Sequence, residues 1–234
     1  MVGKGFQSPV ARRLFLARVG TGLGVLGGAT AAGTPAAAAQ PAEDGHWQPV
    51  RHPQDDWFDK ISGKHRFLFD TTSPEGLASA LQFANNYFEA NKNSYGLQDS
   101  DLAVVLVLRH KSTTFGYNDA MWMKYGAHLS THANNFTDPK TKEPPTINVY
   151  GTPGNAAGQG GRMDALLKRG VHLAVCQMAT RNIAGIIARA TGATTETVVD
   201  ELVANLVSNA RMVPAGIVAV NRAQEWGYAF VHAG

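Results

Sequence analysis

The chain has 234 residues, of which 44% are hydrophobic and 17% charged, which is a globular composition and excludes a chain disordered throughout. Its net charge of +3 originates in residues 1–39, which hold no acidic residue and four basic ones, Lys4, Arg12, Arg13 and Arg18. The remaining 17 basic and 18 acidic residues argue against nucleic acid as a partner. The single cysteine, Cys176, excludes an intramolecular disulfide.

Residues 1–39 are predicted to be a twin-arginine export signal. The pair Arg12–Arg13 is followed by one spacer and then by Phe15 and Leu16, which resembles the twin-arginine motif. The stretch that follows is rich in Gly, Ala and Thr and is too polar for a stable membrane span. We expect cleavage near Gln40 and delivery of the folded protein to the periplasm or another extracytoplasmic space by the twin-arginine translocase. The alternative is a disordered, Ala-rich N-terminus with a chance arginine pair.

A linker is predicted over residues 40–64, and a single domain over residues 65–234. Compact apolar runs predict strands at residues 65–70, 102–108, 146–150, 171–175 and 228–232. Helical spacing and capping residues predict helices at residues 74–95, 119–125, 162–169, 180–190, 198–207 and 213–226, with a loop over 130–145. Alternating strands and helices predict an α/β domain with a mainly parallel sheet of four to five strands, covered on both faces.

The chemistry of such a sheet is expected at the carboxyl ends of its strands. Cys176 ends one predicted strand and precedes a helix, whose positive end favours the reactive thiolate. Arg181 is near the same helix start and would add to the effect. His110 ends another strand and could serve as an acid, base or ligand. The alternatives are a buried structural cysteine and a histidine bonded to a loop carbonyl.

Three further features allow more than one interpretation. Trp122 and Lys124 belong to an aromatic and basic patch, which suits a pocket wall, an oligomer contact, or core with a snorkelling lysine. His128 and His132 are four residues apart and could share a helix face, but they fall near a predicted loop and predict no metal site. Residues 151–161 are rich in glycine but lack the ending of a P-loop, so we expect a surface loop and no cofactor.

Several segments are similar to DsrE-like proteins, the sulfur-relay superfamily that includes the TusD type. The closest likeness is the strand–turn–helix from Gly170 to Cys176 followed by Gln-Met-Ala-Thr-Arg181. Residues 213–230 resemble the end of the same domain, and residues 108–110 and 118–126 are similar to an exported branch. The chain differs from the relay members in being exported and in lacking an Ala-rich turn after the cysteine.

The resemblance implies a flavodoxin-like three-layer α/β/α domain that forms homo-oligomers. It also implies that Cys176 carries sulfur as a persulfide, exchanged with a donor or acceptor protein. In this first hypothesis His110 and Arg181, from their positions at the strand end and the helix start, assist the thiol. The alternative is a non-enzymatic ligand-binding or assembly module with a structural Cys176. Its pocket would be lined by residues from the strand ends and the middle of the chain, namely His110, Asn118, Trp122 and Lys124. A metal protein using His110, His128 and His132 is a third hypothesis.

Overall fold

The computed structural model describes residues 48–151 and 163–234. The predicted signal at residues 1–39 lies outside this range, and so do nearly all of the glycine-rich residues 151–161. Within the described part of the chain, no helix is both long enough and apolar enough to cross a membrane.

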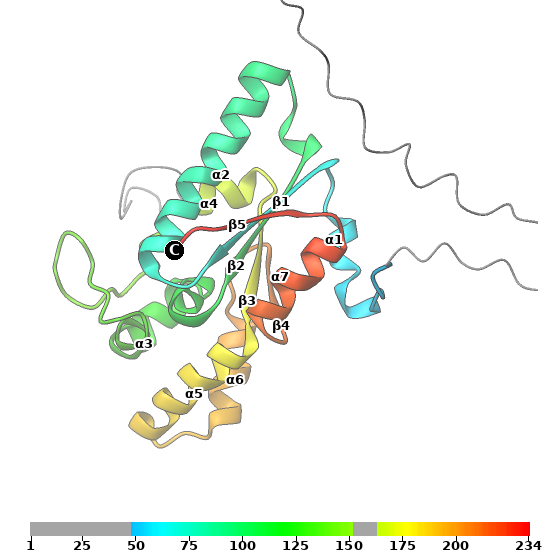
Figure 1. Ribbon diagram of the computed structural model, residues 1–234. Coiled ribbons are helices and arrows are strands. Elements are labelled where there is room, and N and C mark those ends of the chain that lie inside the picture. The colour runs from blue at the N-terminus through cyan, green and yellow to red at the C-terminus, as the bar shows by residue number, and fades with distance from the viewer. Residues whose placement is uncertain (1–47, 152–162) are drawn as a thin grey trace, which may run out of the picture. The chain divides into compact units, whose positions relative to one another are not determined.

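Five strands form one sheet in which all neighbouring strands run parallel (Figure 1). They are β1 His65–Thr71, β2 Leu102–Leu108, β3 His172–Cys176, β4 Ala210–Val213 and β5 Ala229–His232. The strand order is β4-β3-β2-β1-β5. All seven residues of β2 are apolar and buried, as expected for a central parallel strand covered on both faces. The predicted parallel sheet is therefore confirmed.

The helices pack in two layers, one on each face of the sheet. They are η1 Pro53–Asp55, α1 Trp57–Lys60, α2 Pro74–Tyr95, η2 Asp99–Asp101, η3 His110–Gly116, α3 Asp119–His132, α4 Met163–Lys168, α5 Gln177–Thr191, α6 Thr195–Ala204 and α7 Gly216–Glu225. Helices α2 to α6 share one apolar cluster with the sheet, called here the α2–α6 cluster. Helices α1 and α7 form the α1/α7 cluster on the opposite face. The three-layer α/β/α architecture is confirmed.

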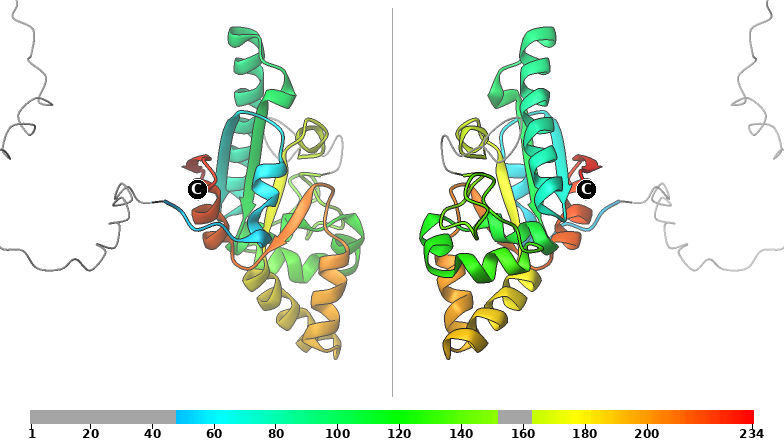
Figure 2. Two further views of the ribbon diagram at one scale, coloured as in Figure 1. Left: turned by 90° about the vertical axis from the view of Figure 1, so that its right-hand side faces the viewer. Right: turned by 90° about the vertical axis from the view of Figure 1, so that its left-hand side faces the viewer.

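This division into layers follows from the strand order. Parallel crossovers are almost always right-handed, so connections that step across the sheet in one direction place their helices on one face. The chain steps from β1 to β4 in one direction, and it returns across the sheet to β5 through α7, which therefore lies on the other face. In both views of Figure 2, α2 lies toward one end of the folded unit and the α5–α6 pair toward the other.

Helix α2 shows how local sequence sets an element. The Ser73 hydroxyl accepts a hydrogen bond from the Gly76 amide at 3.0 Å, and Pro74 occupies the first helical position. The helix ends at Gly96, whose φ of +67° is easily adopted by glycine. Both ends of this helix are as the sequence predicts.

Two expectations about the N-terminal and middle segments are wrong. Phe58 is fully buried, and its carbonyl accepts a hydrogen bond from the Tyr228 hydroxyl at 2.8 Å. The second half of the predicted 40–64 linker therefore belongs to the folded domain. Residues 146–150 form turns and no strand, because Asn148 uses its amide to bind the carbonyls of Phe115 and Tyr117, both at 2.8 Å.

Two element boundaries also differ from those expected. β4 occupies Ala210–Val213, where no strand was predicted, and the last helix begins at Gly216 and not at Val213. Helix α3 continues to His132, so Ser130 and Thr131 are helical and not part of a loop. Thr131 donates to the Ala127 carbonyl at 2.9 Å and Ser130 to the Phe136 carbonyl, which satisfies both polar side chains locally.

Candidate functional site

The alternation of side chains along the strands places three residues on the same face of the sheet, at its carboxyl end. Leu68, Val107 and Ala174 all belong to the α1/α7 cluster. Side chains two positions apart in an extended chain point to the same face, so the residue two positions further on also faces α7, in β1, directly after β2, and in β3. These residues are Asp70, Arg109 and Cys176.

Asp70 holds Arg109 in place. The Arg109 Nε and Nη2 atoms donate to the two carboxylate oxygens of Asp70 at 2.7 and 2.8 Å, and His232 Nδ1 lies 2.8 Å from Asp70 Oδ2. The Asp70 side chain is 2% exposed and that of Arg109 26%. This bidentate pair orients the guanidinium plane, while the carboxylate stays shielded from solvent behind it. Asp70, Arg109, Cys176 and His232 are together called the carboxyl-edge cluster.

Helix α7 starts against the side chain of Arg109. A β-carbon placed on Gly216 would lie 2.4 Å from Arg109 Cβ and 3.0 Å from its Cδ, so only glycine fits at this position. The aliphatic stem of Arg109 is therefore packed under the first residue of α7, and its guanidinium is fixed from two sides.

Cys176 occupies the point where the chain changes faces. β3 is followed by α5 on one face of the sheet, and the neighbouring β4 is followed by α7 on the other. In open α/β sheets, ligands bind in the crevice that such diverging connections leave at the strand ends. Cys176 pairs with Val213 across this position and is 7% exposed. It belongs to neither of the two apolar clusters, although both of its neighbours in β3, Ala174 and Val175, do.

The backbone at Cys176 is secured by buried hydroxyls. The Thr180 hydroxyl donates to the Cys176 carbonyl at 2.9 Å and accepts from the Tyr117 hydroxyl at 2.8 Å. Burial raises the pKa of Tyr117 above its ordinary value, so this donor keeps its proton at neutral pH.

Arg109 supplies the positive charge near the thiol. Leu108 of β2 lies opposite Val175 of β3, so Arg109 is level with Cys176. The pKa of Arg109 is raised mainly by its hydrogen bond to Asp70, and the negative charge of a Cys176 thiolate raises it further. Arg181 is exposed and is five residues beyond Cys176, a rotation of about 140° around α5. Arg109, and not Arg181, is therefore the guanidinium at the thiol.

His110 starts η3 and turns away from the strand direction. Its φ of +55° is unusual for a residue other than glycine. The side chain is exposed, and the His110 carbonyl accepts a hydrogen bond from His132 Nε2 at 3.0 Å. In residues 48–151 and 163–234, no hydrogen bond links the His110 ring to Cys176.

The three predicted ligand-binding residues have structural partners. Asn118 caps α3 by accepting from the Met121 amide at 3.3 Å. Trp122 is fully buried and stacks on Phe115 with ring centroids 5.3 Å apart, so it is core and lines no pocket. Lys124 pairs with Glu201 of α6. The pocket expected from His110, Asn118, Trp122 and Lys124 is therefore not formed.

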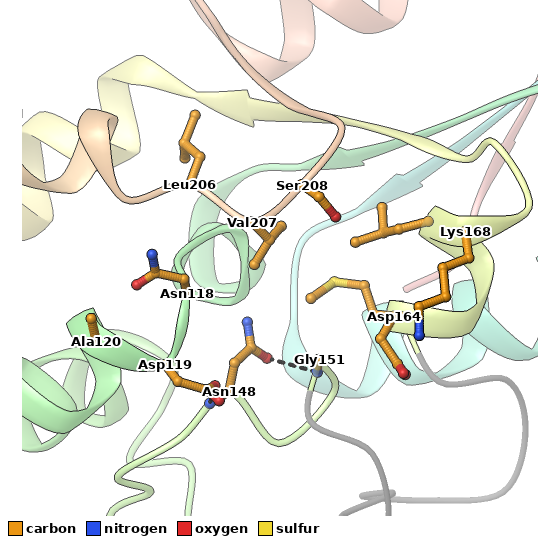
Figure 3. Close-up of a pocket in the computed structure, with 12 residues that line it drawn as sticks. Asn118, Asp119, Ala120, Asn148, Gly151, Asp164, Lys168, Leu206, Val207 and Ser208 are labelled. Atoms are coloured by element: carbon orange, nitrogen blue, oxygen red, sulfur yellow. Dashed lines mark hydrogen bonds between the residues drawn. The ribbon is translucent and has the colours of Figure 1, made fainter.

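Asn118 instead lines a different cavity, of about 530 Å³ (Figure 3). The cavity walls come from the start of α3, from α4 and from the segment before β4: they include Asp119, Asn148, Lys168, Leu206 and Ser208. Asn148 points toward Gly151 and accepts its amide proton at 3.2 Å. None of the described residues that line this cavity belongs to the carboxyl-edge cluster.

The histidines of α3 do not form a metal centre with their surroundings. His132 is buried, and burial lowers its pKa below the ordinary value. Across the described residues, no group of three or more His, Cys, Asp or Glu side chains is arranged to hold a metal ion.

Comparisons with known proteins add little to this geometry. No family model matches the chain, and no curated protein matches it. Among solved structures, a protein of unknown function from Methanobacterium thermoautotrophicum is similar at 12% sequence identity and a TM-score of 0.36, over 72% of this chain and 99% of that one. A match at this level supports no function.

Proposed function

We propose that the protein is an exported, DsrE-like sulfur carrier in which the Cys176 thiolate accepts a sulfane sulfur and holds it as a persulfide. The observation that carries the proposal is the position of Cys176 at the carboxyl end of β3, where the connections after β3 and β4 diverge to opposite faces of the sheet, within electrostatic range of Arg109. A cysteine that only fills space behaves as a small hydrophobe and packs within a core. Cys176 is buried at 7% exposure, but it ends a strand and lies within electrostatic range of the Arg109 guanidinium.

The transfer is an exchange of one sulfur between two nucleophiles. The Cys176 thiolate attacks the outer sulfur of a donor X–S⁻, the X–S bond breaks, and X⁻ leaves with the bonding electron pair. Cys176 then carries –S–S⁻, and no external oxidant or reductant is needed. An acceptor thiolate on a partner protein removes the outer sulfur in the same way. His110 and Arg181 have no assigned step in this exchange and remain predictions from the sequence.

Mass spectrometry of the intact protein tests the carrier role. After incubation with glutathione persulfide, the native protein should gain the mass of one sulfur atom, and dithiothreitol should remove it. Cys176→Ser should show no gain in mass. Arg189→Gln, near the far end of the α5 helix that follows Cys176, should load as the native protein does. A native protein that stays unmodified while free cysteine is persulfidated in the same tube would overturn the proposal.

Export is tested separately. Replacing both Arg12 and Arg13 with lysine should leave the full chain in the cytoplasm, because the twin-arginine route depends on that pair. Normal delivery of the doubly substituted chain outside the cytoplasm would contradict the export part of the proposal and leave the chemistry at Cys176 untouched. A homo-oligomer, which the family resemblance implies, should appear as a larger mass in light scattering of the native protein.

A further inference from the structure

One edge of the Arg109 guanidinium is hydrogen-bonded to Asp70, and the other edge forms no hydrogen bond within the described residues. Nε and Nη2 both donate to Asp70, and no hydrogen bond from Nη1 is formed within the described residues. Arg109 is also the member of this pair that reaches solvent, at 26% exposure against 2% for Asp70. An anion approaching from outside therefore meets the guanidinium before it meets the carboxylate.

Arg109 lies within electrostatic range of the reacting sulfur, because a Cys176 thiolate contributes to the raised pKa of Arg109. Arg109 directly follows β2 and Cys176 ends β3, each one position beyond the paired residues Leu108 and Val175, and the alternation along the extended chain turns both side chains toward the face that carries α7. Gly216 packs on the Arg109 stem and Asp70 fixes the plane of its head, so the guanidinium is oriented before any ligand arrives. A fixed, planar donor beside a nucleophile suits a substrate with oxyanion oxygens next to the atom under attack.

We propose that Arg109 recognises the leaving group of the sulfur donor, and that the donor is an oxyanion of the thiosulfate or thiosulfonate class. This inference rests on the proposed function and names the substrate class of the same site. With thiosulfate, the Cys176 thiolate attacks the outer sulfur, the S–S bond of thiosulfate breaks, and sulfite departs with the electron pair. Arg109 donates to the sulfite oxygens as their negative charge increases.

Asp70 and His232 act through Arg109 and are positioning residues. The Asp70 carboxylate prevents the guanidinium from turning, and His232 holds Oδ2 of that carboxylate from β5. Lysine at position 109 would keep the positive charge but would lose the second donor edge, so it is the conservative variant that separates charge from geometry.

Alkylation by two reagents of different charge tests the inference without any sulfur donor. The rate constants for iodoacetate, an anion, and for neutral iodoacetamide are measured on the native protein, and their ratio cancels changes in the amount of thiolate. We expect Arg109→Gln to lower the iodoacetate-to-iodoacetamide ratio by about tenfold, Arg109→Lys to lower it partly, and Arg189→Gln to leave it unchanged. Because Arg109→Gln leaves the buried Asp70 carboxylate with His232 as its remaining side-chain partner, Asp70→Asn/Arg109→Gln is measured beside it and should show the same low ratio.

Sulfur loading supplies the second measurement. The native protein should gain one sulfur from thiosulfate and release one sulfite for each, and Arg109→Lys should do so more slowly while still loading from glutathione persulfide. Equal alkylation ratios in the native protein, Arg109→Gln and the double variant would overturn the role of Arg109 even if Cys176 carries sulfur. Failure to load from any donor, with the ratio lowered as expected, would overturn the carrier role and keep Arg109 as an anion-binding residue.

Discussion

The carboxyl-edge cluster and the α3 region both gather polar side chains, but they use them differently. In the α3 region, Asn118 caps the helix and Lys124 pairs with Glu201, so each polar group joins one element to another. In the cluster, the Asp70 carboxylate is bonded to Arg109 and His232, whereas neither Nη1 of Arg109 nor the buried thiol of Cys176 forms a hydrogen bond within the described residues. The types of residue in the two regions are similar. The regions differ in whether each polar side chain has a hydrogen-bond partner within the protein.

The largest effect is expected in the α3 region, where Trp122→Ala should lower the free energy of unfolding by about 3–5 kcal/mol, because a fully buried indole stacked on Phe115 is lost. Denaturant unfolding measures it. Met123→Ala changes an exposed neighbour on the same helix and should stay within about 0.5 kcal/mol. Equal losses of unfolding free energy for the two substitutions would contradict the assignment of Trp122 to the core.

The next effect concerns the cluster. Asp70→Asn should lower the free energy of unfolding by about 2–3 kcal/mol, because Arg109 loses a buried, bidentate partner. Asp59→Asn breaks the exposed pair with Arg66 and should cost less than about 1 kcal/mol. The two variants carry the same change in contrasting surroundings, and chemical denaturation compares them directly. A larger loss for Asp59→Asn would contradict the assigned burial of the cluster.

A smaller loss of stability is expected when Asn118, the cap of α3, is replaced. Asn118→Ala removes the cap of α3 and its 3.2 Å contact with Asn205, and should lower the free energy of unfolding by about 1 kcal/mol. Asn118→Ser should restore part of this loss, because serine also caps helices. If alanine costs no stability, the cap is unimportant and Asn118 would be better understood as a wall of the cavity in Figure 3.

The smallest expected effect is on the pH dependence of folding stability, through His132. Burial lowers the pKa of His132 in the folded protein below its ordinary value of 6.5, so the unfolded chain binds a proton more readily. Stability from this group is complete above that value and is lost as the pH falls below it. His132→Gln keeps a donor for the His110 carbonyl and should reduce the loss of stability between neutral pH and about pH 5. Thermal melts across that range would show an unchanged pH slope if the account of His132 is mistaken.

Local sequence predicted the framework well where one signal dominated. The apolar run of β2 and the capping residues of α2 specify their elements almost without tertiary context. The four residues of β4 alternate between partly exposed and exposed up to Val213, so they lack the apolar run that marks the central strands. Residues 146–150 have a strand-like composition, but the hydrogen bonds of Asn148 hold them as turns.

The candidate site was predicted only in part. The position of Cys176 at a strand end follows from the sequence, whereas its partner Arg109 required the strand order and the register. A charged residue directly after a buried apolar strand, as in Leu108-Arg109, was the available signal. His232 could not have been placed near Asp70 from the sequence, because β5 adds to the sheet beside β1 and His232 comes 162 positions after Asp70.

The proposed function requires that the Cys176 thiol reacts while the protein is folded. The most direct measurement is its rate of alkylation by iodoacetamide in rising, sub-denaturing concentrations of urea. We expect a rate that is already high without urea and does not change with it, because the thiol reacts from the folded state at the carboxyl ends of β3 and β4. A rate that is negligible in buffer and rises with the unfolded population would show that Cys176 reacts only after unfolding, and would contradict the claim.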